Sequence, residues 1–256
     1  MSIRPWLEHR IRIGSLPVDS MHMEGALDAI DVLVHAKQGG TVFTPNVDHV
    51  VQAEHDARFR SAYEGVSLSL VDGMPLLWAS RLLKTPLPEK VSGSDLIMPL
   101  MRRAAERGYR VYFLGGAPGS AELAKQKLLA ELPGLQVVGI DDGRIDPNGT
   151  AEQQKPILDR ISAAQPDLLL VALGAPKQEL WAHEQRESLG HAVAIGVGAS
   201  LDFIAGSQRR APAWMSRAGL EWAYRLGQDP KRMASRYLLR DPEFFGIVAK
   251  QMLAAR

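Results

Sequence analysis

One carboxylate stands out by its position in the sequence. Asp72 comes directly after the apolar segment 67–71 and is followed by Gly73. A carboxylate at the end of a buried strand can accept a proton from a bound hydroxyl, and partial burial adjusts its pKa for that task. The alternative interpretation is that Asp72 caps the helix that follows.

Two glycine-rich turns follow other apolar segments. The first contains Gly115 and Gly116, and the second runs from Gly174 to Pro176. Glycine lets the backbone approach a ligand closely, and the free amides at the positive end of the next helix favour a phosphate, so a diphosphate fits. Each turn alone is equally compatible with a structural role. Neither a G-x-G-x-x-G pattern after the first strand nor a Walker motif is present.

Polar residues also follow the other apolar segments. These residues are Thr44 and Asn46 after 41–44, Lys177, Gln178 and Glu179 after 168–173, and Gly198 and Asp202 after 192–197. In a parallel sheet, ligands bind outside the carboxyl ends of the strands. We therefore expect these ends to form one site together with Asp72 and the two glycine turns.

The elements that must position these residues alternate along the chain. Short, continuously apolar segments predict strands buried on both faces, and amphipathic segments such as 20–37, 47–63 and 92–108 predict helices between them. This alternation predicts an α/β fold with a doubly wound, mainly parallel, Rossmann-like sheet over residues 1–206. Residues 207–256 are predicted to form a basic, amphipathic helical appendage.

The net charge of +1 hides an asymmetry. Residues 207–256 contain ten Lys or Arg and four Asp or Glu, a net of +6, which leaves −5 for residues 1–206. A basic segment favours the phosphates of a ligand or an anionic membrane surface, although helices with ordinary solvated charges fit as well. Nucleic acid is not an expected partner, because the segment contains no recognisable binding module and the rest of the chain is acidic.

The amino-acid composition limits the classes of protein and the kinds of site that the chain can form. A chain of 256 residues with 46% hydrophobic residues can bury a large core. No apolar run approaches the roughly 18 residues of a membrane span, and the start of the sequence lacks a signal-peptide pattern, so a cytoplasmic location is expected. Cysteine is absent, the seven histidines are scattered, and neither H-E-x-x-H nor Asp-x-Asp occurs, so neither a metal nor a cofactor is expected.

Seven segments together resemble the WecG/TagA/CpsF family of bacterial glycosyltransferases. They are TPNVDHV at 44–50, VDG at 71–73, VSGSDL at 91–96, FLGGAPG at 113–119, PDLLLVALGAPKQE at 166–179, GVGASLDFIAG at 196–206 and RRAPAWMSRAGLEWAYRLGQDPKR at 209–232. They follow the family's order over nearly the whole chain. G-A-P-K-Q-E and R-A-P…G-L-E-W-x-Y-R-L are the most specific of them.

The resemblance implies an inverting, metal-independent enzyme of polysaccharide or exopolysaccharide synthesis. Such an enzyme moves N-acetylmannosamine, its uronic acid or glucose from a UDP-sugar to a polyprenyl diphosphate-linked sugar at the inner face of the cytoplasmic membrane. By resemblance, Asp72 is the catalytic base, and Thr44, Asn46 and Gln178 lie near the donor sugar. The alternative is a catalytically silent UDP-sugar-binding subunit of a polysaccharide assembly complex. The oligomeric state is open, a homo-oligomer included.

The resemblance also indicates how the diphosphate is held. In the family the basic appendage is thought to fold over the active site, and Arg225 and Arg232 match its arginines by position. Lys90 stands where many members have Arg, and Ser235 replaces a third appendage Arg, with Arg236 next to it. The expected substrate-binding set is Lys90, Gly115, Gly116, Gly174, Pro176, Lys177, Glu179, Gly198, Asp202, Arg210, Arg225, Arg232 and Arg236.

The appendage also carries aromatic and aliphatic residues between its basic ones. Examples are Trp214, Trp222, Tyr237 and Leu239. This mixture is typical of helices that lie at a membrane surface, and it predicts docking to an anionic bilayer. The alternative is that these side chains simply pack on the core.

Overall fold

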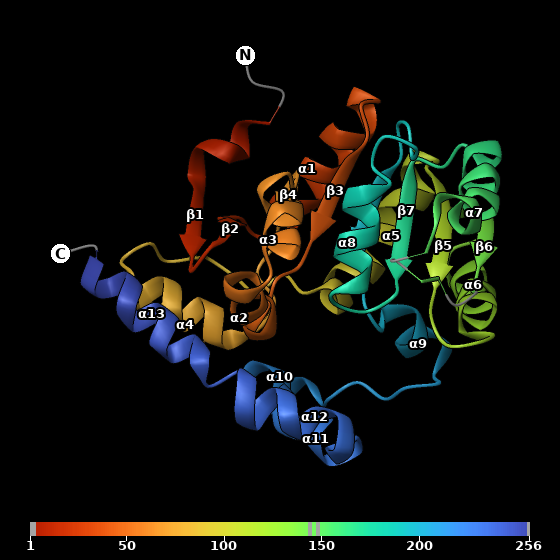
Figure 1. Cartoon of the computed structure of the whole chain (residues 1–256). Helices are drawn as coiled ribbons and strands as arrows, with labels where there is room; N and C mark the ends of the chain where they lie inside the picture. Colours follow the sequence, from red (N-terminus) through yellow and green to blue (C-terminus); the bar gives the residue numbers. More distant parts are fainter. Residues whose placement is uncertain (1–3, 143–144, 147–148, 255–256) are drawn as a thin grey trace.

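A parallel sheet forms the centre of the protein in the computed structural model, which describes residues 4–142, 145–146 and 149–254 (Figure 1). Within these residues the sheet has six strands in the order β4 (Leu68–Ser69), β3 (Gly40–Phe43), β8 (Val193–Gly196), β7 (Leu168–Ala172), β5 (Arg110–Gly115) and β6 (Gln136–Asp141). Every neighbouring pair is parallel. The prediction of a doubly wound, mainly parallel α/β fold is confirmed.

Helices cover both faces of this sheet. One face packs against α1 (Met23–Ala36), α5 (Gly93–Arg107), α6 (Ser120–Glu131) and α9 (Ser200–Ala205). The other packs against α2 (Val47–His55), α3 (Ala57–Glu64), α7 (Ala151–Ala164) and α8 (Lys177–Glu184). Helix α4 (Met74–Leu82) contributes Leu76 and Leu77 to this second core.

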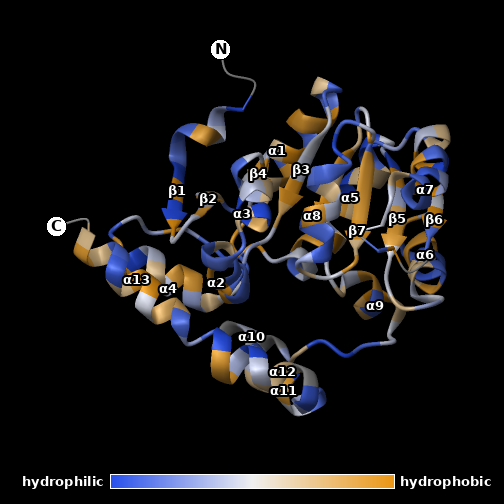
Figure 2. Cartoon of the chain, viewed as in Figure 1, coloured by the Kyte–Doolittle hydropathy of each residue, from blue (hydrophilic) through white to orange (hydrophobic). Residues whose placement is uncertain are grey.

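Alternate strand residues fill the two cores. Leu168 and Leu170 of β7 belong to one core, and Leu169 and Val171 to the other. Successive strand side chains point to opposite faces, so a continuously apolar strand serves both cores. Figure 2 shows these hydrophobic strands between the helices.

Two local features differ from the sequence-based expectation. The single helix expected over 47–63 is two helices, because the Asp56 side chain accepts hydrogen bonds from the backbone N–H groups of Arg58 and Phe59 and so starts α3. The structure also has a 3₁₀ turn, η1 (Pro5–His9), and an antiparallel pair, β1 (Arg10–Ile13) with β2 (Leu16–Asp19). These four-residue strands are too short to give a clear periodicity.

The C-terminal segment is helical. Helices α10 (Ala213–Arg217), α11 (Glu221–Gln228), α12 (Pro230–Ala234) and the π-helical turn η2 (Ser235–Arg240) lie below the carboxyl ends of the strands in Figure 1. Helix α13 (Glu243–Ala254) then returns to the α/β body, where Phe244 and Val248 are buried in the second core. The Gly14 N–H donates to Gln251 Oε1 at 2.8 Å. The domain boundary at residue 206 stays a prediction.

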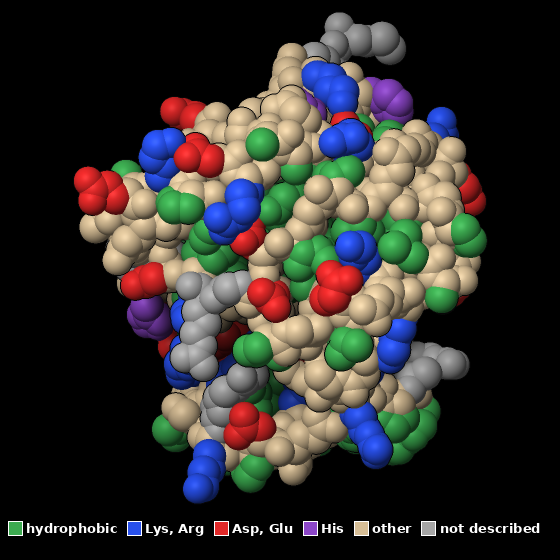
Figure 3. Space-filling model, turned by 90° about the vertical axis from the view of Figure 1, so that its right-hand side faces the viewer, with side chains coloured by type: hydrophobic (Ala, Val, Ile, Leu, Met, Phe, Trp, Pro, Cys, Tyr) green, Lys and Arg blue, Asp and Glu red, His purple; other side chains and the backbone are tan. Residues whose placement is uncertain are grey.

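Charges of both signs are mixed on the β6 side of the molecule. Figure 3 faces this side and shows Lys and Arg interspersed with Asp and Glu. Arg160 pairs with Asp141 at 2.6 Å, and Lys155 pairs with Asp159 at 2.8 Å. Neither sign of charge dominates this side of the molecule.

Gly115 and Gly174 differ in how strongly their surroundings require a glycine. Gly115 has φ +90°, and a Cβ there would lie 2.7 Å from the carbonyl oxygen of Ala172. Gly174 has φ +72° with nothing within 4 Å of such a Cβ. We expect both substitutions to alanine to cost the roughly 1–2 kcal/mol of a left-handed backbone, and Gly115→Ala to cost more because it also meets backbone. Urea unfolding measures the difference, and equal losses would contradict it.

Candidate active site

A cavity of about 410 Å³ lies between α4 and the C-terminal helices. Five of the predicted site residues line it, namely Asn46, Asp72, Lys90, Arg225 and Arg236. Its apolar wall comes from Met74 and Trp78 of α4 and from Leu220, Trp222, Leu238 and Phe245 of the C-terminal segment. A charged group and a hydrocarbon group can therefore be accommodated in the same cavity.

Backbone hydrogen bonds fix the position of Asp72. Its N–H donates to the carbonyl of Pro45 at 2.8 Å, and the N–H of Val91 donates to the carbonyl of Val71 at 2.9 Å. These two bonds bring Asn46 and Lys90 beside Asp72. The N-cap of α4 is Gly73, at φ 105°, and no side-chain hydrogen bond caps the helix. The structure therefore does not support the helix-capping interpretation of Asp72.

The surroundings of Asp72 favour its role as a base. Burial raises the pKa of this carboxyl group, and the negative charge of Glu221 raises it further, while Arg225 and Lys90 act in the opposite direction. A carboxylate with a raised pKa has a higher proton affinity than an exposed one. Asp72 is therefore suited to remove a proton from a hydroxyl group bound in the cavity.

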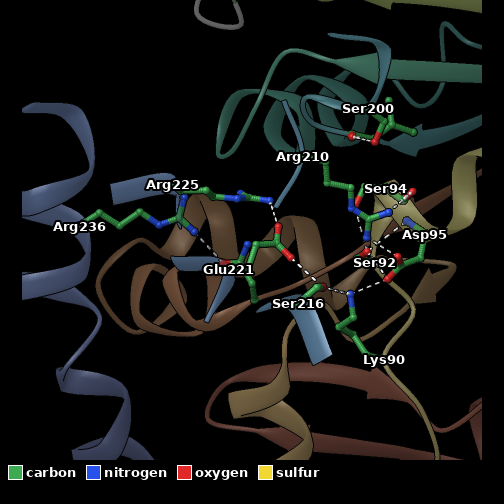
Figure 4. Close-up of polar contacts among 12 residues, drawn as sticks. Lys90, Ser92, Ser94, Asp95, Ser200, Arg210, Ser216, Glu221, Arg225 and Arg236 are labelled. Atoms are coloured by element: carbon green, nitrogen blue, oxygen red, sulfur yellow. Dashed lines mark hydrogen bonds and ion pairs between the residues drawn. The ribbon is translucent and has the colours of Figure 1, made fainter. Parts of the chain in front are cut away.

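A chain of polar contacts joins the α/β body to the C-terminal helices (Figure 4). Lys90 Nζ lies 2.6 Å from Asp95 Oδ2 and donates to Ser216 Oγ at 3.3 Å. Ser216 Oγ donates in turn to Glu221 Oε2 at 3.1 Å, and Glu221 pairs with Arg225 within α11. The chain runs from the start of α5 through α10 to α11, so it holds the appendage over Asp72.

Arg210 belongs to this network but does not line the cavity. It pairs with Asp95 and donates to the carbonyl of Ser94 at 3.2 Å. Burial of Asp95 opposes ionisation, but hydrogen bonds from Arg210, Lys90 and Ser92 lower its pKa to about 2. Asp95 is therefore a permanent negative charge beside the cavity, and it engages two cations that were predicted to bind substrate.

Arg236 approaches the cavity from the opposite side. Its guanidinium donates to Asn46 Oδ1 at 3.1 Å, and its Nε lies 3.4 Å from Asp48 Oδ2. It also stacks over the ring of Tyr237 at 5.4 Å. Arg236, proposed from sequence as the neighbour of a missing arginine, thus reaches the cavity, whereas the side chain of Arg232 lies outside the described residues.

The remaining predicted side chains lie behind the cavity or outside it. Thr44 and Gln178 are buried, and Gln178 Oε1 accepts a hydrogen bond from the Gly198 N–H at 3.0 Å. Glu179 is 0% exposed, so it contacts other protein groups and not a ligand. Lys177 is exposed to solvent.

The first glycine turn is bonded to carboxylates of the protein itself. The Ala117 N–H donates to Asp202 Oδ1 at 2.9 Å, and the Gly119 N–H donates to Asp142 Oδ2 at 3.0 Å. Gly116 lies against the same Asp202 oxygen. Two amides that were expected to bind a phosphate are therefore engaged, and Asp202 contacts this turn and not the cavity.

The order of the strands separates the two sets of predicted residues. Asn46 and Asp72 follow β3 and β4, whereas Gly115, Gly116, Gly174 and Pro176 follow β5 and β7 on the far side of β8. None of the four lines the cavity. The predicted residues therefore occupy the same edge of the sheet, but they do not all meet in one cavity.

Sequence reasoning did not single out several residues of the site. Glu221, Asp95, Trp78 and Asp241 contribute charge or apolar surface to the cavity or its network. Glu221 and Asp95 lie inside family-like segments, which was the available signal. Trp78 gave no signal, because its role depends on packing between α4 and the appendage.

Two features are absent from the part of the chain that the structure describes. No group of three or more His, Cys, Asp or Glu side chains there is arranged to hold a metal ion. Likewise, none of the described helices combines the length and the apolar character needed to cross a membrane.

Comparison with known proteins identifies the family. The sequence profile of the glycosyl transferase WecG/TagA/CpsF family matches residues 11–256, and the chain belongs to that family. The predicted family and the predicted enzyme class, a glycosyltransferase, are thereby confirmed.

Two similar proteins are both named N-acetylglucosaminyldiphosphoundecaprenol N-acetyl-β-D-mannosaminyltransferase. The one from Bacillus spizizenii strain W23 is 31% identical over 218 residues, which cover 85% of this chain and 82% of the relative. The one from Bacillus subtilis strain 168 is 30% identical over 227 residues, which cover 87% of this chain and 86% of the relative.

The charge of Glu221 gives a testable pH dependence. If Asp72 acts as a base, kcat/KM rises with pH as its carboxyl group loses a proton, and the raised pKa places this rise above the ~4 of an exposed Asp. Glu221→Gln removes a negative charge that raises this pKa, so the rise should move to lower pH. The control is Glu187→Gln, at an exposed glutamate beside Arg186. An unchanged profile in Glu221→Gln would rule out this coupling.

Proposed function

We propose that the protein transfers a sugar from a UDP-sugar to a hydroxyl group of a sugar carried on polyprenyl diphosphate, with inversion at the anomeric carbon. The observation that carries this proposal is the cavity in which Asp72, with its raised pKa, lies among Lys90, Arg225 and Arg236 beside an apolar wall. A base, a set of cations and a hydrocarbon surface are what such a pair of substrates requires.

The proposed chemical step is a single displacement. The acceptor hydroxyl oxygen forms a bond to the anomeric carbon while the bond from that carbon to the UDP oxygen breaks. Asp72 takes the hydroxyl proton, and UDP leaves with the electron pair of the broken bond. A base positioned in this way contributes about 10²- to 10⁴-fold to a rate. Inversion follows because the acceptor attacks opposite the leaving group.

Lys90, Arg225 and Arg236 are the groups that we assign to the charge of the leaving diphosphate. In the structure each is paired with a carboxylate, Lys90 with Asp95, Arg225 with Glu221 and Arg236 with Asp48. A diphosphate must therefore compete with these carboxylates. Because forked guanidinium groups suit phosphate oxygens, we propose that the cations neutralise the leaving group without a divalent metal.

The comparisons favour particular substrates within this reaction. Both relatives are named for transfer of an N-acetyl-β-D-mannosaminyl group to N-acetylglucosaminyldiphosphoundecaprenol. We therefore propose this donor group and this acceptor as the first to test, with the uronic acid of N-acetylmannosamine and glucose as the competing donor sugars. A screen of the three UDP-sugars that follows UDP release decides among them.

Replacing Asp72 tests the mechanism. We expect Asp72→Asn to lower kcat by about 10²- to 10⁴-fold while the Kd for the donor changes little. The raised pKa means that the ionised group is disfavoured in the folded state, so its cost to stability appears as pH rises above the ~4 of the unfolded chain. Asp72→Asn removes this cost and should raise the Tm at pH 7.

The control for this replacement is Asp159→Asn, at an exposed residue paired with Lys155. Measurable turnover that is equal in Asp72→Asn and the wild type would contradict Asp72 as the base, and no UDP release above background by the wild type would support a non-catalytic subunit. Loss of wild-type turnover after treatment with a chelator, and its recovery with a divalent cation, would contradict the metal-independent step.

A lipid-linked acceptor requires the protein to reach the membrane, and we propose a docking surface for this contact. The surface comprises exposed apolar side chains of α4, α10, η2 and α13, namely Trp78, Leu82, Trp214, Leu238, Leu239 and Phe245. Three of them, Trp78, Leu238 and Phe245, also line the cavity. We propose that this surface rests on the inner face of the cytoplasmic membrane, where an acceptor headgroup enters the cavity from the lipid side.

Vesicle flotation tests this placement. Trp214 is 63% exposed and Leu239 is 77% exposed, so changing both to serine should leave the fold intact and reduce binding to vesicles that contain phosphatidylglycerol. Added salt should weaken wild-type binding, because the attraction is partly electrostatic. The control is Leu123→Ser. Leu123 is 48% exposed and lies on α6, away from this surface. Equal flotation of all three proteins would exclude the docking surface.

A further inference from the structure

We propose that Glu179 and His49 are positioning residues, which act together to hold Asn46 and Gln178 in place for the donor sugar. This inference rests on the proposed function and on the expectation, from the family resemblance, that Asn46 and Gln178 lie near the donor sugar. Asn46 lines the cavity, and Gln178 is buried behind it. Glu179 and His49 are both buried, 0% and 4% exposed, so they act through these two neighbours.

Glu179 fixes the amide of Gln178. Its Oε1 accepts a hydrogen bond from Gln178 Nε2 at 2.8 Å, and a carboxylate can only accept. Gln178 Oε1 accepts in turn from the Gly198 N–H at 3.0 Å. The orientation of the Gln178 amide is therefore determined at both ends, by α8 on one side and by the loop after β8 on the other.

The same carboxylate oxygen reaches Asn46 through His49. His49 Nε2 lies 3.4 Å from Glu179 Oε1, and His49 Nδ1 lies 2.7 Å from Asn46 Oδ1. The backbone N–H of Asn46 also donates to His49 Nδ1 at 3.3 Å, and the Asn46 side chain caps α2, so His49 contacts Asn46 at both its side chain and its backbone. Asn46 Oδ1 also accepts from Arg236, which leaves the Asn46 amide NH₂ as the group available to a ligand in the cavity.

These contacts join helices that follow two different strands of the sheet. His49 is in α2, which follows β3, and Glu179 is in α8, which follows β7; β8 lies between these strands. The pair therefore ties together two strand ends that are not adjacent. Among the residues that the structure describes, Glu179 Oε2 has no hydrogen-bond partner. Because a partly satisfied buried carboxylate is a poor source of stability, its use in holding two polar side chains is the better explanation.

A mutant cycle tests the inference. We expect Glu179→Gln to lower kcat by about 10- to 100-fold, as small misplacements of binding groups do. In a protein that already carries Asn46→Ala and Gln178→Ala, the same change should lower kcat by less than about threefold, because the groups that it positions are gone. The matched control is Glu184→Gln, at a surface carboxylate of the same helix that pairs with Arg58. Full additivity would overturn the inference.

A spectroscopic measurement tests it without turnover. In ¹⁵N NMR spectra, Glu179→Gln should shift the His49 Nε2 signal and the side-chain amide signal of Gln178, whereas Glu184→Gln should leave both unchanged. Unchanged His49 and Gln178 signals in Glu179→Gln would overturn the inference. An inactive wild-type protein in which both signals respond to Glu179→Gln would count against the proposed function and leave the contacts of Glu179 supported.

A second variant, His49→Gln, tests the inference if Glu179→Gln does not fold. His49→Gln breaks the link to Asn46 and leaves the contact between Glu179 and Gln178. Its loss of kcat should disappear in an Asn46→Ala protein and persist in a Gln178→Ala protein. Losses that persist equally in both would mean that His49 does not act through Asn46.

Discussion

The partial burial of Asp72 by the C-terminal helices is the physical constraint on which the candidate site depends. Asp72 follows strand β4, and residues of α10 and α11 line the same cavity, so its side chain is only partly exposed. Burial is the largest cause of its raised pKa and the charge of Glu221 is the next, so the pKa of Asp72 depends in part on residues more than 140 positions later in the chain. The α/β body and the C-terminal helices thus form the candidate site together.

The C-terminal helices are held on the α/β body by polar and ionic contacts. These contacts also involve the candidate substrate-binding residues. Lys90 contacts Ser216, and Arg236 contacts Asn46 and Asp48, so cations of the site connect the two parts of the chain. These cations are partly buried and need partners, since an unpaired buried charge is costly. The carboxylates of Asp95, Glu221 and Asp48 supply that compensation and keep the cations in place.

Much of the fold could be predicted from the residues themselves. The continuously apolar strands, the Ser92 cap and the stop at Gly108 of α5 each depend on local physics, and the structure has them where the sequence indicates. The break at Asp56 was missed, because a helical periodicity continues across it. The β1–β2 pair was missed because four residues give too few alternations to distinguish a strand.

The sequence by itself determined the types of residue at the strand ends, the position of Asp72 after a buried strand, and the family. Only the tertiary structure decided which of these residues meet. The order of the strands put Gly115 and Gly174 beyond β8 from Asp72, the packing of α4 on the C-terminal helices made the apolar wall, and the fold buried Glu179. The reason is physical: residue types and periodicity are local properties, whereas neighbourhood across a sheet depends on how strands far apart in the sequence pair.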